Sequence, residues 1–233
     1  PDNKRQTSIA VTGMKLPLDI VAWTETKQLF IADYDTDCVW RVSLDGQHVD
    51  KWLTNKSTST TRHLRPYSLS LTSRRLLVTS WPVNNSLFLF GSDGVQLKHI
   101  SLSNMEVLRH AVETSHETFI VCHNTASQSQ VSEVDVAGHV IRVYCDQQQL
   151  GSPRYLALDS DGRLFVADSD KHRVLLLNSR LELERVLLDT EHHQLAQRPV
   201  RLCYVEQTRQ LIVAGGSRDT SHVIQVYRIR ESS

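Results

Sequence analysis

The feature that most constrains the fold is an internal repeat of four short apolar segments separated by turn residues. The clearest copy covers residues 152–188, and its four apolar runs are 155–159, 164–167, 174–177 and 183–188. Asp161-Gly162 and Asn178-Ser179-Arg180 provide turns between these runs. Short runs rich in β-branched residues and leucine, separated by such turns, predict an antiparallel meander of four strands.

The same order of strands and turns recurs along the whole chain. Three further full copies and one shortened copy are recognisable, at 16–53, 64–102, 106–144 and 198–229. Four copies begin at a proline, namely Pro17, Pro66, Pro153 and Pro199. Divided over 233 residues, five repeats are about 47 residues long, whereas six would be about 39. The chain is therefore expected to hold five repeats, with six as the alternative.

A repeated four-stranded unit of this length is typical of one blade of a β-propeller. We therefore predict an all-β fold, a single propeller domain over residues 1–233 with five four-stranded blades. The last repeat stops after its third strand, and the segment from Gln6 to Val11 precedes the first repeat as an isolated apolar run. Pairing of this segment with Val223 to Ile229 would supply the missing strand and close the ring.

Composition narrows the classes of function. The 26 basic and 26 acidic residues balance, which is unusual for a domain that mainly grips nucleic acid. No apolar run is long enough to span a membrane, and no signal peptide is recognisable at the polar beginning of the chain. Four cysteines stand far apart without a paired motif; Cys38, Cys122 and Cys203 adjoin apolar runs. Reduced, mostly buried thiols and a cytoplasmic location are expected.

The repeat resembles the NHL family of β-propellers. Residues 165–174, FVADSDKHRV, are nearly a consensus copy, and 30–42, FIADYDTDCVWRV, keep the Ala-Asp pair but lose the His-Arg. The other three copies depart further from the pattern. Most known NHL propellers have six blades, so the count of five departs from the family. The resemblance implies a domain like those at the C-terminus of TRIM-type ubiquitin ligases, which recognise proteins or RNA. Other relatives are peptide-amidating lyases, lactonases and esterases.

By the family pattern, the starts of the inner strands and the loops between second and third strands share one face. Four of the five starts carry arginine, and several carry an aromatic residue or histidine. The candidate binding residues at these starts are Arg65, Tyr67, Arg109, His110, Arg154, Tyr155, Arg198 and Arg201. The candidate loop residues are Trp81, as an exposed aromatic anchor, with Lys171, His172 and Arg173. Arginine beside stacking surfaces suits acidic peptides, phosphates or bases; the alternative is that these arginines pair with aspartates such as Asp33 and Asp168.

Catalytic and metal-binding patterns are weak. Asp33, Asp35 and Asp37 alternate but lack the glycine and closing glutamate of a calcium loop. The ring expected to line the central channel, Asp19, Ser68, His110, Tyr155 and Arg201, contains one histidine and does not assemble a three-histidine zinc site. No nucleophile elbow, phosphate loop or HExxH motif is present. No cofactor, metal or catalytic residue is predicted.

These observations favour a non-catalytic, monomeric interaction module that reads a protein or an acidic peptide. Single-stranded RNA binding on the same face is the closest alternative, and a metal-dependent lyase or lactonase-like propeller is a lesser one.

Overall fold

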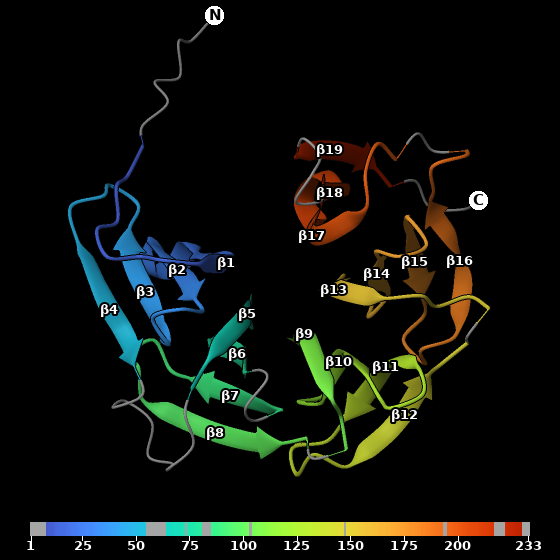
Figure 1. Cartoon of the computed structure of the whole chain (residues 1–233), viewed down its shortest axis with the longest axis horizontal. Helices are drawn as coiled ribbons and strands as arrows, with labels where there is room; N and C mark the ends of the chain where they lie inside the picture. The colour runs from blue at the N-terminus through green and yellow to red at the C-terminus, as the bar shows by residue number, and fades with distance from the viewer. Residues whose placement is uncertain are drawn as a thin grey trace, which may run out of the picture.

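The computed structural model describes residues 8–54, 64–72, 74–80, 85–102, 104–146, 148–192, 195–216 and 222–229. Their strands form five separate antiparallel sheets, each made of strands consecutive in sequence. In Figure 1 the sheets stand around a common axis like the blades of a propeller, which confirms the predicted fold and the count of five blades.

Each blade begins with its innermost strand and proceeds outward. Blade 1 contains β1 (Pro17–Trp23), β2 (Gln28–Asp33), β3 (Cys38–Ser43) and β4 (Val49–Thr54), and a 3-10 turn, η1 (Thr24–Thr26), lies between its first two strands. Blade 2 contains β5 (Pro66–Leu71), β6 (Leu76–Ser80), β7 (Ser86–Phe90) and β8 (Gln96–Ser101). Blade 3 contains β9 (Val107–Glu113), β10 (Phe119–Asn124), β11 (Ser129–Val134) and β12 (Val140–Tyr144).

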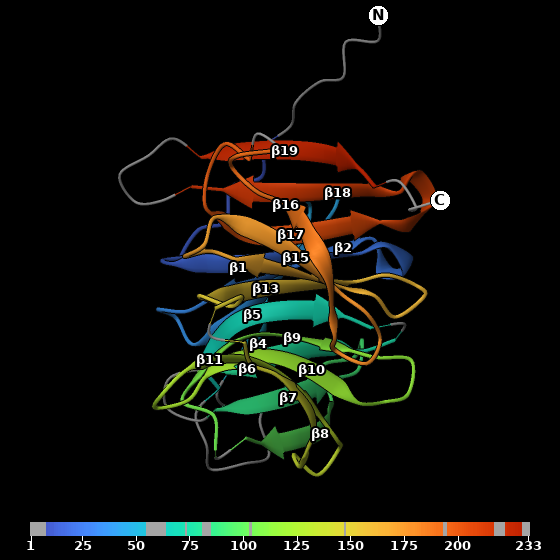
Figure 2. The same cartoon turned by 90° about the vertical axis from the view of Figure 1, so that its right-hand side faces the viewer.

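Blade 4 contains β13 (Pro153–Leu158), β14 (Leu164–Asp168), β15 (Arg173–Leu177) and β16 (Leu183–Leu188). In the part of the chain that the structure describes, blade 5 contains three strands, β17 (Pro199–Val205), β18 (Gln210–Gly215) and β19 (Val223–Arg228), with η2 (Glu206–Thr208) between the first two. Figure 2 shows the disc from the side, with the strands of blade 5 running along the ring axis and β19 at its outer rim.

Tight turns hold the strands of a blade in register. Gly138 follows Asp135-Val136-Ala137 in the turn between β11 and β12, at φ +88°, and its N–H donates to the carbonyl of Asp135. A Cβ at this glycine would come within 2.5 Å of the carbonyl oxygen of Ser101 in blade 2. Glycine is required here for both conformation and space.

The hydrophobic core lies between consecutive blades. Four clusters of buried side chains join blades 1 and 2, 2 and 3, 3 and 4, and 4 and 5. Phe30 and Phe88 represent the first cluster and Phe165 and Leu211 the last, each no more than 1% exposed. No such cluster among the described residues joins blade 5 to blade 1.

The predicted closing strand is wrong. Blade 5 has three strands, and residues 8–11, the described part of the segment from Gln6 to Val11, form no strand. Instead, Ile9 packs against Gly46 in the turn between β3 and β4. Contact with the outer part of blade 1 therefore replaces pairing with blade 5.

Cysteine placement agrees only in part with expectation. All four thiols are free; Cys38 and Cys122 are buried, whereas Cys145 and Cys203 are exposed. Burial raises the pKa of the Cys122 thiol to about 12, which makes it unreactive. The expected burial of Cys203 is wrong because none of the described sheets packs on its side of blade 5. No helix in the described ranges is long and apolar enough to cross a membrane.

Candidate functional site

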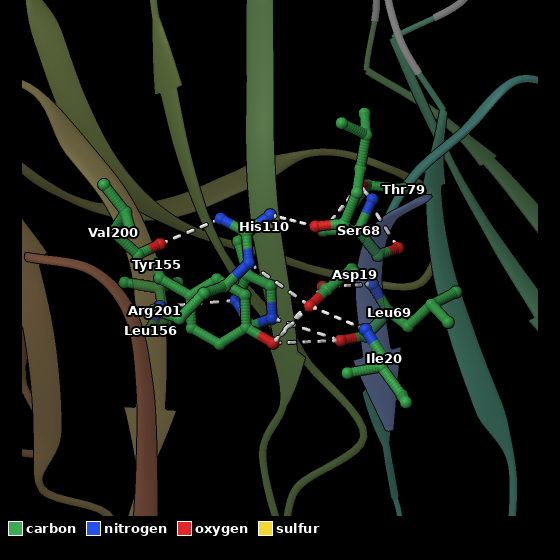
Figure 3. A network of polar contacts seen from close by, with 11 residues as sticks. Asp19, Ile20, Ser68, Leu69, Thr79, His110, Tyr155, Leu156, Val200 and Arg201 are labelled. Carbon is green, nitrogen blue, oxygen red and sulfur yellow. Dashed lines mark hydrogen bonds and ion pairs between the residues drawn. The ribbon is translucent and has the colours of Figure 1, made fainter. Parts of the chain in front are cut away.

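The axis of the ring is occupied by a polar network in which all five blades take part (Figure 3). Its members come from equivalent positions near the start of each inner strand, namely Asp19, Ser68, His110, Tyr155 and Arg201. The structure thus brings together the ring of residues that the repeat placed at the channel.

Asp19 is the acceptor at the centre of this network. Its carboxylate lies 3.3 Å from the Nε of Arg201 and accepts hydrogen bonds from the Tyr155 hydroxyl at 3.2 Å and from the N–H of Leu69 at 2.9 Å. Burial raises the pKa of Asp19, and the charge of Arg201 opposes that rise. Burial and the neighbouring Asp19 also raise the pKa of Tyr155 well above its ordinary value, so its hydroxyl remains a donor.

Arg201 joins the last blade to the first. Its guanidinium donates to the carbonyl oxygens of Leu18 and Val200, while it pairs with Asp19 and lies 5.1 Å from the ring centre of Tyr155. This side chain therefore holds β17 beside β1.

His110 is a neutral spacer within the network. Its ring stacks on Tyr155, with centroids 3.6 Å apart. Nδ1 accepts from the N–H of Leu156 at 3.3 Å, so the proton lies on Nε2, which donates to the carbonyl of Leu69 at 3.3 Å. Burial and the nearby Arg201 lower the pKa of His110 to about 3.

The axial network thus satisfies its own polar groups. Both His110 nitrogens and the Asp19 carboxylate have protein partners, so a ligand would have to displace these bonds. Among the described residues, no three His, Cys, Asp or Glu side chains converge as a metal site would require. His110, Tyr155 and Arg201, predicted as binding residues, lie in this network, and the first two are at most 8% exposed.

A second region is the face that carries the starts of the inner strands and the loops between second and third strands, here called the loop face. Asp168, at the end of β14, is fully buried and accepts hydrogen bonds from the N–H groups of Gly151 and Ser152. Its carboxylate also pairs with Arg173 at 3.4 Å. The aspartate of the repeat motif therefore ties the segment leading into the inner strand of its own blade to the end of the second strand.

Asp33 has the same role in blade 1. It accepts from the N–H groups of Lys15 and Leu16, the Thr36 hydroxyl and the Trp40 indole at 2.6–3.1 Å. Burial opposes its ionisation, but these hydrogen bonds prevail and lower its pKa. Asp33 and Asp168 are thus structural, and Arg173 belongs to this structural group.

Arginine and tyrosine side chains meet on the loop face between blades 1 and 3. The Arg65 guanidinium lies 4.1 Å from the ring centre of Tyr34 and its Nε lies 3.5 Å from the Asp37 carboxylate. Tyr34 meets Tyr67 edge to face at 6.4 Å, and the Tyr67 hydroxyl accepts from Arg109 at 3.0 Å. Arg65, Tyr67 and Arg109 therefore form one connected patch.

Arg154 extends this patch toward blade 5. It is half-buried, and its Nε has no hydrogen-bond partner among the described residues. Burial lowers its pKa, and the positive charges of Arg109 and Arg198 lower it further; Tyr67 and Asp170 oppose them. Arg154 thus lies in the field of two other arginines without a paired carboxylate in the described part of the chain.

The remaining predicted residues are more peripheral. Arg198 pairs with Asp170 and donates to the carbonyl of Ser169, and Lys171 donates to the carbonyl of Gln148. His172 is exposed in the loop after β14, at φ +50°. Trp81 lies outside the described residues.

The predicted binding residues leave out two acidic members of this face. Asp37 and Asp170 partly neutralise Arg65 and Arg198. Each follows the motif aspartate of its repeat, Asp33 or Asp168, by a few residues, but loop positions of this kind reveal no partner before the blades are placed side by side.

Comparison with known proteins places the chain within a class of folds. A family model described as "NHL repeat" matches residues 150–175, within blade 4 and the segment leading into it. A comparison with curated proteins finds no match.

Solved structures match over most of the chain. A chain in a crystal structure of a nidogen/laminin complex aligns with a TM-score of 0.66 at 16% identity, covering 87% of this chain and 73% of that one. A protein of unknown function from Bacteroides caccae aligns with a TM-score of 0.66 at 15% identity, covering 90% and 74%. A catalytically inactive virginiamycin B lyase from Staphylococcus aureus, solved with quinupristin, aligns with a TM-score of 0.64 at 13% identity, covering 97% and 74%.

The fold defines a five-bladed β-propeller. Within this propeller, residues 150–175, in the segment before blade 4 and in the blade itself, match the NHL repeat. At these identities the solved structures establish the fold alone.

Proposed function

We propose that the loop face binds an acidic segment of a partner protein and that the chain is a non-catalytic interaction module. The observation that carries the proposal is Arg154, which lies half-buried in the field of Arg109 and Arg198 with a buried Nε that lacks a hydrogen-bond partner among the described residues. A buried donor without an acceptor is costly, and an incoming carboxylate would satisfy it.

The electrostatics favour an anionic ligand. Asp170 offsets the repulsion among Arg109, Arg154 and Arg198 only in part, and a carboxylate that enters beside Arg154 would relieve more of it. Binding would therefore gain more than a single exposed ion pair provides. The presence of a similar propeller fold in a nidogen/laminin complex supports protein binding as a use of this architecture.

The test uses a short fluorescein-labelled polyglutamate peptide as probe. Combined Arg109→Glu, Arg154→Glu and Arg198→Glu changes are expected to weaken its binding about tenfold or more, since each removes a partner and adds repulsion. Arg201 is left intact because it holds the axis. A variant of equal charge change elsewhere, Lys51→Glu, Arg74→Glu and Arg180→Glu, is the matched control.

If both variants lost the same affinity for the peptide, binding would depend only on net charge, and the loop face would not be the binding site. Urea unfolding of both variants checks that the blades remain folded.

Single-stranded RNA is the second candidate, favoured by the presence of Tyr34 and Tyr67 beside arginines. Arg65 already lies over the Tyr34 ring, and Tyr67 meets the edge of Tyr34, so less aromatic surface is free for bases. We therefore rank RNA below protein. Oligouridine is expected not to bind at low salt; binding that falls steeply as salt rises would reverse this ranking.

A further inference from the structure

The outer edge of blade 5 differs from the other four blades. In blades 1 to 4 a fourth strand pairs antiparallel with the third, as in β3–β4, β7–β8, β11–β12 and β15–β16. β19 pairs with β18 on one side, and the described part of the chain supplies no strand for its other side. One edge of backbone N–H and C=O groups therefore faces outward at the rim (Figure 2).

One equivalent position shows the exposure at this end of the ring, where the described residues provide neither a fourth strand nor an apolar cluster with a following blade. The third strands of blades 1, 2, 3 and 4 place an apolar residue opposite an apolar residue of the fourth strand, and these pairs are Val39–Leu53, Leu87–Ile100, Val131–Tyr144 and Val174–Leu188. All four third-strand residues are 0% exposed. By its pairing with Ala214, which matches Ala32–Val39 in blade 1, Ile224 is their counterpart in β19, and it is 73% exposed.

An apolar surface surrounds Ile224. Leu202, Leu211 and Val213 pack toward blade 4, so the alternate residues of these strands lie on the opposite side of the sheet. Cross-strand register there aligns Cys203, Ile212 and Val226 in one row, and Ala214 and Ile224 in the next. Val226 is 55% exposed, and Ile20 on the facing side of blade 1 is also 55% exposed. Figure 1 shows β19 and β1 on either side of the opening of the ring.

Charge beside this edge is positive. A groove of about 450 Å³ runs between β16 and the end of β19, lined by Arg185, Val186, Leu187, Leu188, Tyr227, Arg228 and Ile229. Its lining contains two arginines and no acidic residue. The Tyr227 hydroxyl is buried there without a hydrogen-bond partner among the described residues.

We propose that β19 accepts an extended strand of a partner protein, which adds antiparallel to its free edge. The four fourth strands of the chain itself indicate the chemistry of this strand: five or six residues long, with a large apolar residue opposite Ile224. The arginines at the other end favour carboxylates on the partner. Backbone hydrogen bonds provide affinity in such strand addition, and the alternating side chains provide selectivity. The site is separate from the loop face and does not depend on the proposed function.

The probe is a short fluorescein-labelled peptide of alternating leucine and glutamate. Its binding is measured by anisotropy, and amide hydrogen exchange of the chain locates it. We expect exchange to slow in β19 and not in the equivalent third strands β3, β7 and β11, which already have a paired strand on each side. The control peptide has the same composition with N-methylated backbone nitrogens, which cannot donate to β19; it is expected to bind at least about tenfold more weakly.

Matched variants locate the contact. Ile224→Lys and Arg228→Glu are each expected to weaken binding about tenfold, whereas Arg74→Glu, an equal charge change in blade 2, leaves it unchanged. All three residues are exposed, so the variants are expected to unfold at the same urea concentration as the parent. The Arg109, Arg154 and Arg198 triple variant is expected to bind this peptide normally, which separates failure of this site from failure of the loop face.

Unchanged exchange in β19, or equal binding of the N-methylated peptide, would overturn the proposal. So would a dimer, detected by light scattering without peptide, in which β19 is protected, because a second copy would then be the occupant.

Discussion

The buried carboxylate of Asp19 and the half-buried Arg201 form a contact between the first and last blades, and the carboxylate also accepts from Tyr155 and Leu69. Exposed ion pairs contribute little to stability, but removing one partner of a buried pair leaves an uncompensated charge. At the residue scale, the axis is therefore the most sensitive part of the molecule.

Asp19→Asn is expected to lower the free energy of unfolding by about 2 kcal/mol, because Arg201 and the N–H of Leu69 lose a charged acceptor. Urea denaturation measures the change. The matched control is Asp50→Asn, which breaks the more exposed pair with Arg41 and should cost no more than about 1 kcal/mol. Equal losses of unfolding free energy in the two variants would show that the axial pair stabilises the fold no more than a surface pair.

His110 predicts a specific dependence on pH. Its pKa of about 3 in the folded chain lies below the ordinary 6.5, so between these values the unfolded chain binds the proton and the folded chain does not. Stability from this residue is thus present above pH 6.5 and decreases as the pH falls toward 3. Asp19, Tyr155 and Arg201 lie beside the His110 imidazole, and all three are retained in a variant that replaces His110 alone.

His110→Gln retains a donor and an acceptor but does not titrate. The free energy of unfolding of this variant is expected to fall less steeply on acidification than that of the parent. The difference between the two slopes is about 1.4 kcal/mol per pH unit between pH 6 and 5. Parallel pH profiles for parent and variant, measured by urea denaturation, would contradict the assignment of His110 as the buried neutral group.

At the scale of elements, the motif aspartates explain how a short loop is held at the start of each inner strand. Asp33 and Asp168 each accept two backbone N–H groups from the segment before the strand. Ser80 does the same with one bond, from the N–H of Arg65. The motif aspartates therefore hold the connections that lead into the blades, and their presence does not indicate a ligand.

Asp168→Ala is expected to cost about 2–4 kcal/mol, because the N–H groups of Gly151 and Ser152 and the Arg173 guanidinium lose a buried acceptor. Thermal or urea unfolding checks this value. Asp161→Ala, at an exposed carboxylate in the preceding turn, between β13 and β14, should change stability by less than about 0.5 kcal/mol. A small effect at Asp168 would mean that the loop is held by other contacts.

At the scale of the whole molecule, each apolar cluster joins neighbouring blades, so the terminal blades pack against one neighbour and the central blades against two. Stability in such repeated structures is close to a sum over neighbouring interfaces. Arg201 adds a polar contact across the opening, but no apolar cluster of the described residues spans it.

Native-state hydrogen exchange is expected to show this difference in stability between the terminal and the central blades. Amides of β2 and β18, in the terminal blades, should exchange through openings of lower free energy than those of β10, in blade 3. Uniform protection across the three strands would show that the ring unfolds as one unit and that the opening has no energetic consequence.

The sequence by itself determined the blade. The turns at Asp161-Gly162, the run 183–188 that became β16, and the count of five repeats all follow from local alternation and turn chemistry, which act over a few residues. It also placed Asp19, His110, Tyr155 and Arg201 at one level of the channel, since equivalent repeat positions become equivalent positions around the ring.

Only the tertiary structure decided which of these residues remain available to a partner. Arg201 pairs with Asp19 across 182 positions of sequence, whereas Arg154 has no paired carboxylate among the described residues, and both are arginines near the start of an inner strand. Local pattern likewise could not predict whether a closing strand forms. The segment around Ile9 suits a strand, but Ile9 packs against Gly46, and β19 has no second partner strand among the described residues. Pairing between distant segments depends on where the blades come to lie, and no short-range preference encodes that position.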